Sequence, residues 1–273
     1  MAAAPFVLAG SVAAGLALAA AVAIFAPLLA ALIWRRRTGA AWTVFGAGAL
    51  VFFVSQGVLR IPWQALLAKW VHQQGDSRPG LQLGFIVFSS FTAGLFEETG
   101  RYVGYRKLVK TTRDLRGGVM YGLGHGGIES ILLVGLSLAG LLVAGVLASM
   151  GKIPPGPAYD GITKQLGGMS FGLALLGGVE RLSALAVHVG LSLVVLQAFN
   201  RGGAKWVLLS IALHTAVNTF GVLAAKHSSG AVAELAIAAM AAAILITGVR
   251  LQRGRERFAG APAGPTFEAG QAS

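Results

Sequence analysis

Apolar residues run in long blocks with few polar interruptions along most of the chain. A bilayer-spanning helix needs about 20 such residues. Seven blocks meet this length: Pro5 to Trp34, Ala41 to Leu59, Leu81 to Tyr105, Gly118 to Met150, Gly168 to Phe199, Trp206 to Ala225 and Val232 to Val249. The first block lacks a basic start and is too long for a removable signal peptide, so we expect a transmembrane helix that bends at Pro27.

The fourth block is longer than a straight span requires. Its 33 residues would reach about 50 Å as a helix, against a hydrocarbon core of about 30 Å. The block begins in a glycine-rich segment, so we expect a kinked or irregular start that lines a cavity. Trp63 and Trp70 indicate a short interfacial helix after the second block, and Pro154, Pro155 and Pro157 indicate an outer loop after the fourth.

Basic residues are distributed unequally between the two ends of these blocks. Fourteen Lys and Arg residues follow the odd-numbered blocks, whereas six, Arg60 among them, follow the even-numbered ones. Cytoplasmic loops carry the excess of positive charge, so the N-terminus is predicted outside and the C-terminus in the cytoplasm. We expect one helical membrane domain over residues 1–257, with a motif-bearing core at about 81–220, and a short disordered cytoplasmic tail over residues 258–273.

Composition supports a polytopic membrane protein. The 273 residues are 55% hydrophobic and 12% charged, whereas soluble domains carry about 25% charged residues. The net charge of +12 would fit a nucleic-acid-binding protein, but apolar blocks of this length exclude a soluble basic domain. The predicted fold is therefore an all-α transmembrane bundle. We expect it in a membrane, and specifically in a bacterial cytoplasmic membrane. The absence of cysteine excludes disulfides, thiolate zinc sites and cysteine nucleophiles.

Several ionisable or strongly polar side chains lie inside the predicted spans. Each charged group costs about 2.5 to 3.5 kcal/mol to insert, so each is a candidate functional residue. The set comprises Glu97, Glu98, Arg101, His125, Glu129, Glu180, Arg181, His188, His214 and Asn218.

Four of these residues are predicted to lie at a similar depth. Glu98, His125, His188 and His214 stand eight to twelve residues from the cytoplasmic edge of their helices, or roughly 12 to 18 Å. Pairs such as His125 and Glu129 are four residues apart and share a helical face. The side chains can therefore converge on one pocket.

The same residues form four ordered motifs. These are EExxR from Glu97, GxGHGGxE ending at Glu129, ER followed by a histidine seven residues after the arginine, and HxxxN from His214. The arrangement resembles the YhfC family of predicted intramembrane metalloproteases, which is similar to the PrsW proteases and to the CPBP group that includes CAAX prenyl endopeptidases. The resemblance runs from about Leu81 to Phe220. Only two residues separate the second glutamate from the arginine, where CPBP proteins usually have three, and this favours YhfC.

The resemblance implies roles for the first two motifs. Glu97 and Glu98 match the paired glutamates, one of which activates water in the CPBP group, and Arg101 matches the basic residue after them. His125, with Tyr121 four residues before it, matches an aromatic-xxx-His motif. The resemblance leaves open which of the two, Glu97 or Glu98, activates the water.

The resemblance also implies roles for the later motifs. His214 and Asn218 match residues thought to stabilise the oxyanion, and His188 looks like the additional histidine of YhfC and PrsW members. Supporting roles fall to the remaining polar residues of the spans: Glu129, Glu180, Arg181, His188 and Tyr102.

Two mechanisms of peptide hydrolysis fit these residues about equally. In the metal-free mechanism, Glu98 or Glu97 takes a proton from water, while histidine and asparagine face the oxyanion. In the metal mechanism, Zn²⁺ is held by Glu98, His125, His188 and His214, with water on the open position. The substrate would be a membrane-embedded or membrane-associated protein or peptide.

Two other classes of function compete with a protease. Buried Glu and His residues also form proton relays, so a proton- or ion-coupled transporter is the main alternative. No repeated half with matching broken helices is visible in the sequence, and many transporters have one. The third class is a non-catalytic scaffold, which would have little reason to retain so many costly charges.

Overall fold

The computed structural model describes residues 6–74 and 78–259, and its regular elements there are all helical. The first part of the chain forms α1 (Gly10–Thr38), α2 (Trp42–Phe52), the π-helical turn η1 (Phe53–Val58), α3 (Ile61–Gln73) and α4 (Pro79–Lys107). The middle forms α5 (Leu115–Glu129), a second π-helical turn η2 (Ser130–Gly135), α6 (Leu136–Ser149) and α7 (Pro157–Gly167). The last part forms α8 (Phe171–Asn200), α9 (Lys205–His227) and α10 (Gly230–Ala259).

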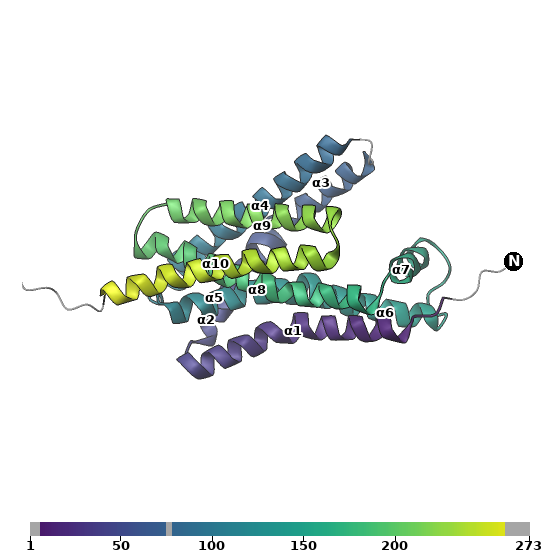
Figure 1. The fold of residues 1–273 in the computed structure, drawn as a ribbon, viewed down its shortest axis with the longest axis horizontal. Helices are drawn as coiled ribbons and strands as arrows, with labels where there is room; N and C mark the ends of the chain where they lie inside the picture. The colour runs from purple at the N-terminus through teal and green to yellow at the C-terminus, as the bar shows by residue number, and fades with distance from the viewer. Residues whose placement is uncertain (1–5, 75–77, 260–273) are drawn as a thin grey trace, which may run out of the picture.

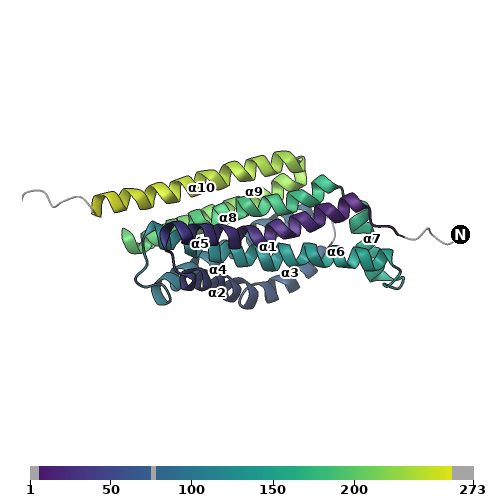
Figure 2. The ribbon, with the colours of Figure 1, turned by 90° about the horizontal axis from the view of Figure 1, so that it is seen from below.

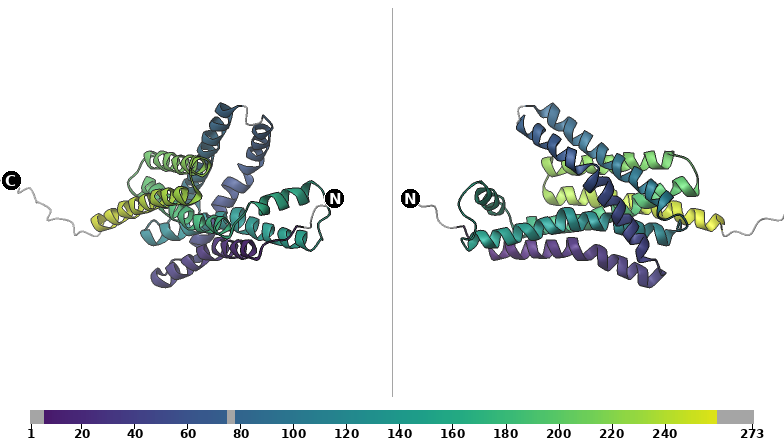
Figure 3. Two further views of the ribbon diagram at one scale, coloured as in Figure 1. Left: turned by 45° about the vertical axis from the view of Figure 1, so that its right-hand side comes forward. Right: turned by 180° about the vertical axis from the view of Figure 1, so that it is seen from behind.

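Helix α8 is the centre of the bundle. Its most apolar stretch is 67% buried, against 17–33% for the other spanning helices. It packs against α1, α4, α5, α9 and α10. Figures 1 and 2 show α1 and α10 running alongside α8, while α3 and the first part of α4 project at an angle (Figure 3). Any side chain on the inner faces of these helices is therefore close to α8.

Local signals in the sequence set several helix ends. Asp114 caps the start of α5 by accepting a hydrogen bond from the backbone N–H of Gly117 at 2.8 Å, and Ser170 caps α8 through Leu173 at 3.2 Å. Gly39 ends α1 with a φ of 72°, a left-handed conformation that favours glycine. α1 is one continuous helix through Pro27.

The prediction of an all-helical membrane protein is confirmed. Six helices are long and apolar enough to cross a membrane, or seven if the pair bent by 41° between η1 and α3 counts as one span. With that pair, the seven apolar blocks and the helices correspond in order. The orientation of the termini, the extent of the single domain and the interfacial position of α3 stay predictions.

The expected irregularity of the fourth block lies elsewhere than predicted. The glycine-rich start is a regular α-helix, and the irregular turn is η2, which follows Glu129. Several glycines instead allow close helix packing, because a Cβ on Gly124 would overlap the backbone of Phe45 in α2. The sequence prediction of a kinked start was therefore wrong, since small residues that permit a kink also permit close contact.

Three smaller differences concern the ends and loops. The segment after the fourth block contains the helix α7, which the prolines alone did not predict. The last helix continues to Ala259, beyond the expected start of the tail, and residues 260–273 lie outside the described part. Pro5, the predicted start of the first block, also lies outside it, and α1 begins at Gly10.

Substitution at Gly124 tests the close contact between α2 and α5. We expect Gly124→Ala to lower the free energy of unfolding by about 1–3 kcal/mol, because the added methyl group meets backbone atoms that cannot rotate away. The matched control is Gly140→Ala in α6, where nothing lies within 4 Å of the new Cβ and helix propensity improves. Thermal unfolding in detergent measures both, and equal stability of the two variants would contradict the packing argument.

Candidate metal centre and its cavity

Helix α4 carries three charged residues into the centre of the bundle. Glu97, Glu98 and Arg101 are 3%, 0% and 0% exposed. Neighbouring residues on a helix point about 100° apart, so the two glutamates face different partners. Glu98 bonds to α9, whereas Glu97 lies between α5, α8 and α9.

Both carboxylate oxygens of Glu98 already have hydrogen-bond partners. Its Oε1 lies 2.7 Å from Nδ1 of His214, and its Oε2 accepts from the Ser210 hydroxyl at 2.6 Å. The guanidinium of Arg101 donates to the same Oε2 at 3.0 Å. A buried carboxylate is stable when it is paired and hydrogen-bonded in this way.

Arg101 connects this pair to His188 on the central helix. Its Nη2 lies 3.1 Å from His188 Nδ1, and because arginine can only donate, the lone pair of the imidazole must be on Nδ1. The proton of the neutral ring is then on Nε2, which lies 2.6 Å from Oε2 of Glu129. The contacts therefore fix the tautomer of His188.

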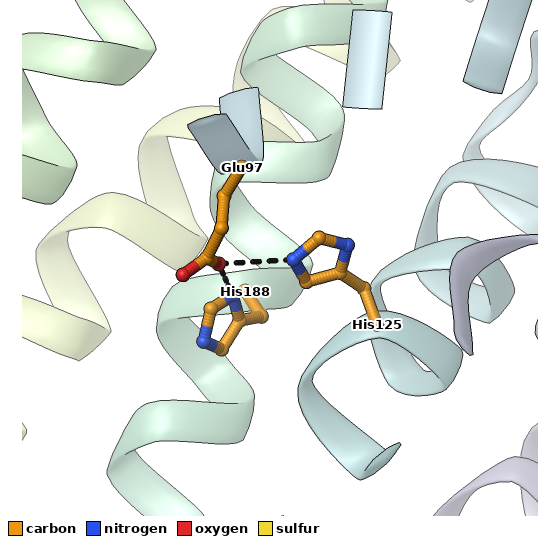
Figure 4. A group of neighbouring side chains, drawn as sticks. All are labelled: Glu97, His125 and His188. Carbon is orange, nitrogen blue, oxygen red and sulfur yellow. Dashed lines mark hydrogen bonds and ion pairs between the residues drawn. The ribbon is translucent and has the colours of Figure 1, made fainter. Parts of the chain in front are cut away.

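Glu97 lies among three histidines from three different helices. Its Oε2 is 3.0 Å from Nε2 of His125 and 3.8 Å from Nδ1 of His188, as Figure 4 shows. Its Oε1 is 3.8 Å from Nε2 of His214. Gln56 of η1 donates its amide N–H to the same Oε1.

The group of Glu97, His125 and His188 has the composition of a catalytic zinc site. Their ligand atoms all lie within 4.8 Å of one another. Two imidazoles and one carboxylate form a known catalytic set. The Glu97 oxygen lies 3.0 Å from the His125 nitrogen and 3.8 Å from the His188 nitrogen, and ligands at about 2.1 Å from one ion lie up to about 4 Å apart. His188 also donates a hydrogen bond from its Nε2–H to the Glu129 carboxylate, as metal-bound histidines commonly do with their second nitrogen. The donor set therefore fits a zinc-like ion.

A second group of possible ligands shares Glu97. Glu97, Glu98 and His214 also offer atoms within 4.8 Å of one another. In this group, however, Glu98 and Nδ1 of His214 already bond to each other, and Glu98 also accepts from Arg101 and Ser210. The first group is therefore the better candidate.

A chain of ion pairs runs outward from His188. Glu129 accepts from Arg181 at 3.2 Å, and Arg181 also pairs with its neighbour Glu180. α8 is unbroken at Gly177 and Gly178, so Glu180 stays one turn or more away from the histidines. These charges are paired with each other while they face the cavity.

The cluster forms one wall of a cavity of about 820 Å³. Glu97, His188 and His214 line its inner part, and Asn218 lies one turn further along α9. Asn218 makes no side-chain hydrogen bond with other described residues. The cavity therefore leads to the Glu97 cluster.

The structure places the predicted residues in two locations. Ten of them gather at the cluster or along the cavity wall: Glu97, Glu98, Arg101, His125, Glu129, Glu180, Arg181, His188, His214 and Asn218. Tyr102 lies apart from them, with its ring stacked on Phe199 at a centroid distance of 4.8 Å.

Sequence reasoning missed a polar relay beside Glu97. Arg60 donates to Oε1 of Gln56 at 2.9 Å and also to Thr92 and Ser89, so the amide N–H of Gln56 is turned toward Glu97. The charge count treated Arg60 as a loop residue, but it is 8% exposed. One sequence signal could have found this relay. Gln56 and Arg60 are four residues apart at the end of an apolar block, so on a helix their side chains lie on the same face.

Gly126 explains how His188 can lie beside His125. A Cβ at Gly126 would come within 2.8 to 3.1 Å of the His188 side chain. Only a residue without a side chain allows the His188 ring to approach α5 at this level. The glycine therefore belongs to the geometry of the cluster.

Comparison with known proteins gives two matches. Residues 19–242 match the profile of the family described as "YhfC intramembrane metalloprotease". The chain is also 33% identical over 217 residues to "Uncharacterized membrane protein YhfC" of Bacillus subtilis (strain 168), which covers 76% of this chain and 83% of that protein. No solved structure matches.

Removal of Arg101 tests the electrostatic balance of the cluster. We expect Arg101→Met to lower the free energy of unfolding by about 3–5 kcal/mol, because Glu98 would remain buried without its guanidinium partner. The double variant Arg101→Met with Glu98→Gln should recover part of this loss. Exposed Arg106→Met on the same helix serves as the control, and unfolding in detergent is the measurement. Additive losses in the double variant would contradict the pairing.

Proposed function

The chain belongs to the YhfC intramembrane metalloprotease family, and from this premise we propose that it is a zinc-dependent endopeptidase that hydrolyses membrane-associated polypeptides. The observation that carries the proposal is the buried group of Glu97, His125 and His188 at the wall of a large cavity. A site of this kind combines metal ligands with space for a substrate.

In this proposal the ion is held by Glu97, His125 and His188. Glu97 takes the place that the sequence hypothesis gave to Glu98, because Glu98 is fully engaged with Arg101, Ser210 and His214. A bound zinc-like ion would supply an activated water and polarise the peptide carbonyl. Arg101, which now donates to Nδ1 of His188, would give up that one contact and keep its bond to Glu98.

The surrounding residues orient these ligands. Glu129 accepts the Nε2 proton of His188, so the lone pair of the ring is on Nδ1, which lies 3.8 Å from Glu97 and would exchange its contact with Arg101 for the ion. Gln56, held by Arg60, fixes the rotation of the Glu97 carboxylate. Such outer contacts commonly change metal affinity by 10–100-fold.

His214 is proposed to move the proton. Its Nδ1 is bonded to Glu98, so Nε2 is the nitrogen that can exchange a proton at the cavity. Glu98 orients the ring and stabilises its charged form, as the carboxylate of a catalytic triad does. Nε2 can thus accept a proton from water beside Glu97 and return it to the leaving amine.

Asn218 supplies a hydrogen-bond donor further along the cavity wall. Its amide has no other side-chain partner among the described residues, so it is free to donate to the substrate carbonyl oxygen. Together, His214 and Asn218 retain the roles that the family resemblance implies for them.

Two substitutions separate metal binding from proton transfer. We expect Glu97→Gln to lose both zinc, measured by elemental analysis, and cleavage of a membrane-anchored substrate in proteoliposomes. We expect His214→Asn to keep near one equivalent of zinc and to lose cleavage because kcat falls. Asp160→Asn on the exposed helix α7 is the control with unchanged activity.

The same measurements distinguish the competing functions. Full cleavage by the Glu97→Gln variant would contradict the proposed site. Proton flux that depends on Glu97 in vesicles, without any proteolysis in the unmodified protein, would favour the transporter. Cleavage by a protein that contains no zinc after gentle purification would favour the metal-free glutamate mechanism.

The Gln56 relay predicts a change in metal affinity. Gln56→Met removes the amide donor but keeps the side-chain length, so we expect the affinity for Co²⁺ to fall about 10–100-fold, with an altered visible spectrum of the bound ion. Gln64→Met is the matched control, because this buried glutamine on α3 donates to Ser89 instead. Equal affinities and spectra in the two variants would contradict a positioning role for Gln56.

A further inference from the structure

The cavity extends from the Glu97 cluster toward one end of the bundle only. On α8 its lining begins at Leu173 and stops at His188, and on α9 it begins at His214 and stops at Ala225. These two helices run in opposite directions, so both stretches lie on the same side of the cluster. The lining residues of α10 come from its first turns, between Gly230 and Ile237.

The other helices show the same asymmetry. The lining of α4 runs from Ser89 to Glu97, on the side toward the start of that helix, and the lining of the α5–η2 span begins at Glu129 and continues to Leu133. The end reached by the cavity is therefore the end that carries the turn between α9 and α10.

In the opposite half of the bundle, packed side chains separate the cluster from the second end. A second cavity of about 570 Å³ lies there between α2, η1 and α4, but its lining includes no residue of the Glu97 cluster. Tyr105 stacks on Tyr121 at a centroid distance of 4.4 Å, and both rings are fully buried. Beyond them, Gln252 accepts hydrogen bonds from Gln197 and Asn200 and donates to the backbone of Arg113. An aromatic layer and an amide network therefore lie between the cluster and the second end.

The two ends also differ in charge. The filled end carries the loops after the odd-numbered apolar blocks, where fourteen Lys and Arg residues lie, and the positive-inside rule predicts that it faces the cytoplasm. The open end carries the loops with few basic residues. Arg60, Glu180 and Arg181 line the cavity on the way to that end, so its wall is polar enough to hold water.

We propose that the Glu97 cluster is reached only from the end of the bundle that carries the α9–α10 turn, so that the substrates are membrane proteins cut in a segment entering from the extracytoplasmic side. That substrates enter the cavity rests on the proposed function, and that they enter from the extracytoplasmic side rests on the predicted orientation. The one-sided access itself rests on the cavity and on the packing opposite to it.

The length of the cavity indicates how much of a substrate it can take. Leu173 and His188 are 15 residues apart on α8, or about 22 Å along the helix axis. An extended chain rises about 3.3 Å per residue, so this path holds about seven residues. The cavity therefore suits a short extended segment of a substrate.

Cysteine labelling tests the access directly, because the chain has no cysteine of its own. Ala184→Cys places a thiol on the cavity wall, and Ala186→Cys is the matched control on the same helix, packed among apolar side chains. Lys110→Cys and Lys152→Cys mark the filled and the open end, since both residues are exposed in loops. A charged, membrane-impermeant maleimide is added to one side of sealed vesicles that contain each full-length variant.

We expect Ala184→Cys to react from the side that labels Lys152→Cys and not from the side that labels Lys110→Cys. Ala186→Cys should not react from either side, because a thiol in a dry environment does not ionise. Labelling of Ala184→Cys from the Lys110 side, or from neither side, would overturn the proposal. Vesicles of known orientation then assign the open end, and labelling at that end from the cytoplasm would overturn the extracytoplasmic part.

Labelling does not depend on cleavage, so this test and the test of the proposed function can fail separately. A protein that labels as expected but cleaves nothing overturns the protease and leaves the one-sided access standing. For an active protease, attachment of the maleimide at Ala184→Cys should abolish cleavage, while the same reagent on Lys152→Cys should leave it unchanged. Unimpaired cleavage by the blocked Ala184→Cys protein would overturn the cavity as the substrate path.

Discussion

Charge that is buried inside a membrane-spanning bundle must be paired, and the arrangement of this protein follows from that constraint. Arg101 is fully buried and bonds both to Glu98 on its own helix and to His188 on α8. Glu98 in turn bonds to α9 through His214 and Ser210. Since an uncompensated buried charge costs several kcal/mol, α4, α8 and α9 are held in one register by the same set of contacts.

Close packing and local irregularity bring the remaining residues to this set. Gly126 lets His188 approach α5, so that His188 and His125 reach Glu97 together. The two π-helical turns lie beside the cluster, η1 with Gln56 and η2 directly after Glu129. Single π-helical turns are frequent at functional sites because the extra residue re-aims the side chains around it. Here they border Glu97 and Glu129, two of the carboxylates that line the cavity.

Much of the fold was predictable, because length and hydropathy determine which segments can cross a bilayer. The spacing from basic helix ends also predicted that Glu98, His125, His188 and His214 share one layer, and the structure brings these residues together. The sequence could not tell which glutamate faces the histidines, since this depends on the rotation of α4 against α5, α8 and α9. It could not reveal the role of Arg60 either, because a basic residue at the end of an apolar block looks the same in a loop and in a buried contact.

The contrast between the two halves of the bundle follows from how the polar groups in each are satisfied. In the filled half, the amides of Gln197, Asn200 and Gln252 bond to one another, to backbone carbonyls and to the side chains of Arg201 and Glu256. In the open half, Glu180 and Arg181 remain partly exposed, and Asn218 faces the cavity without a side-chain partner among the described residues. Partly exposed charges of this kind need water, whereas a hydrolase buried in a bilayer must admit water to its scissile bond. With a cavity in one half and packed side chains in the other, the proposed hydrolytic site can receive water without a continuous channel through the bundle.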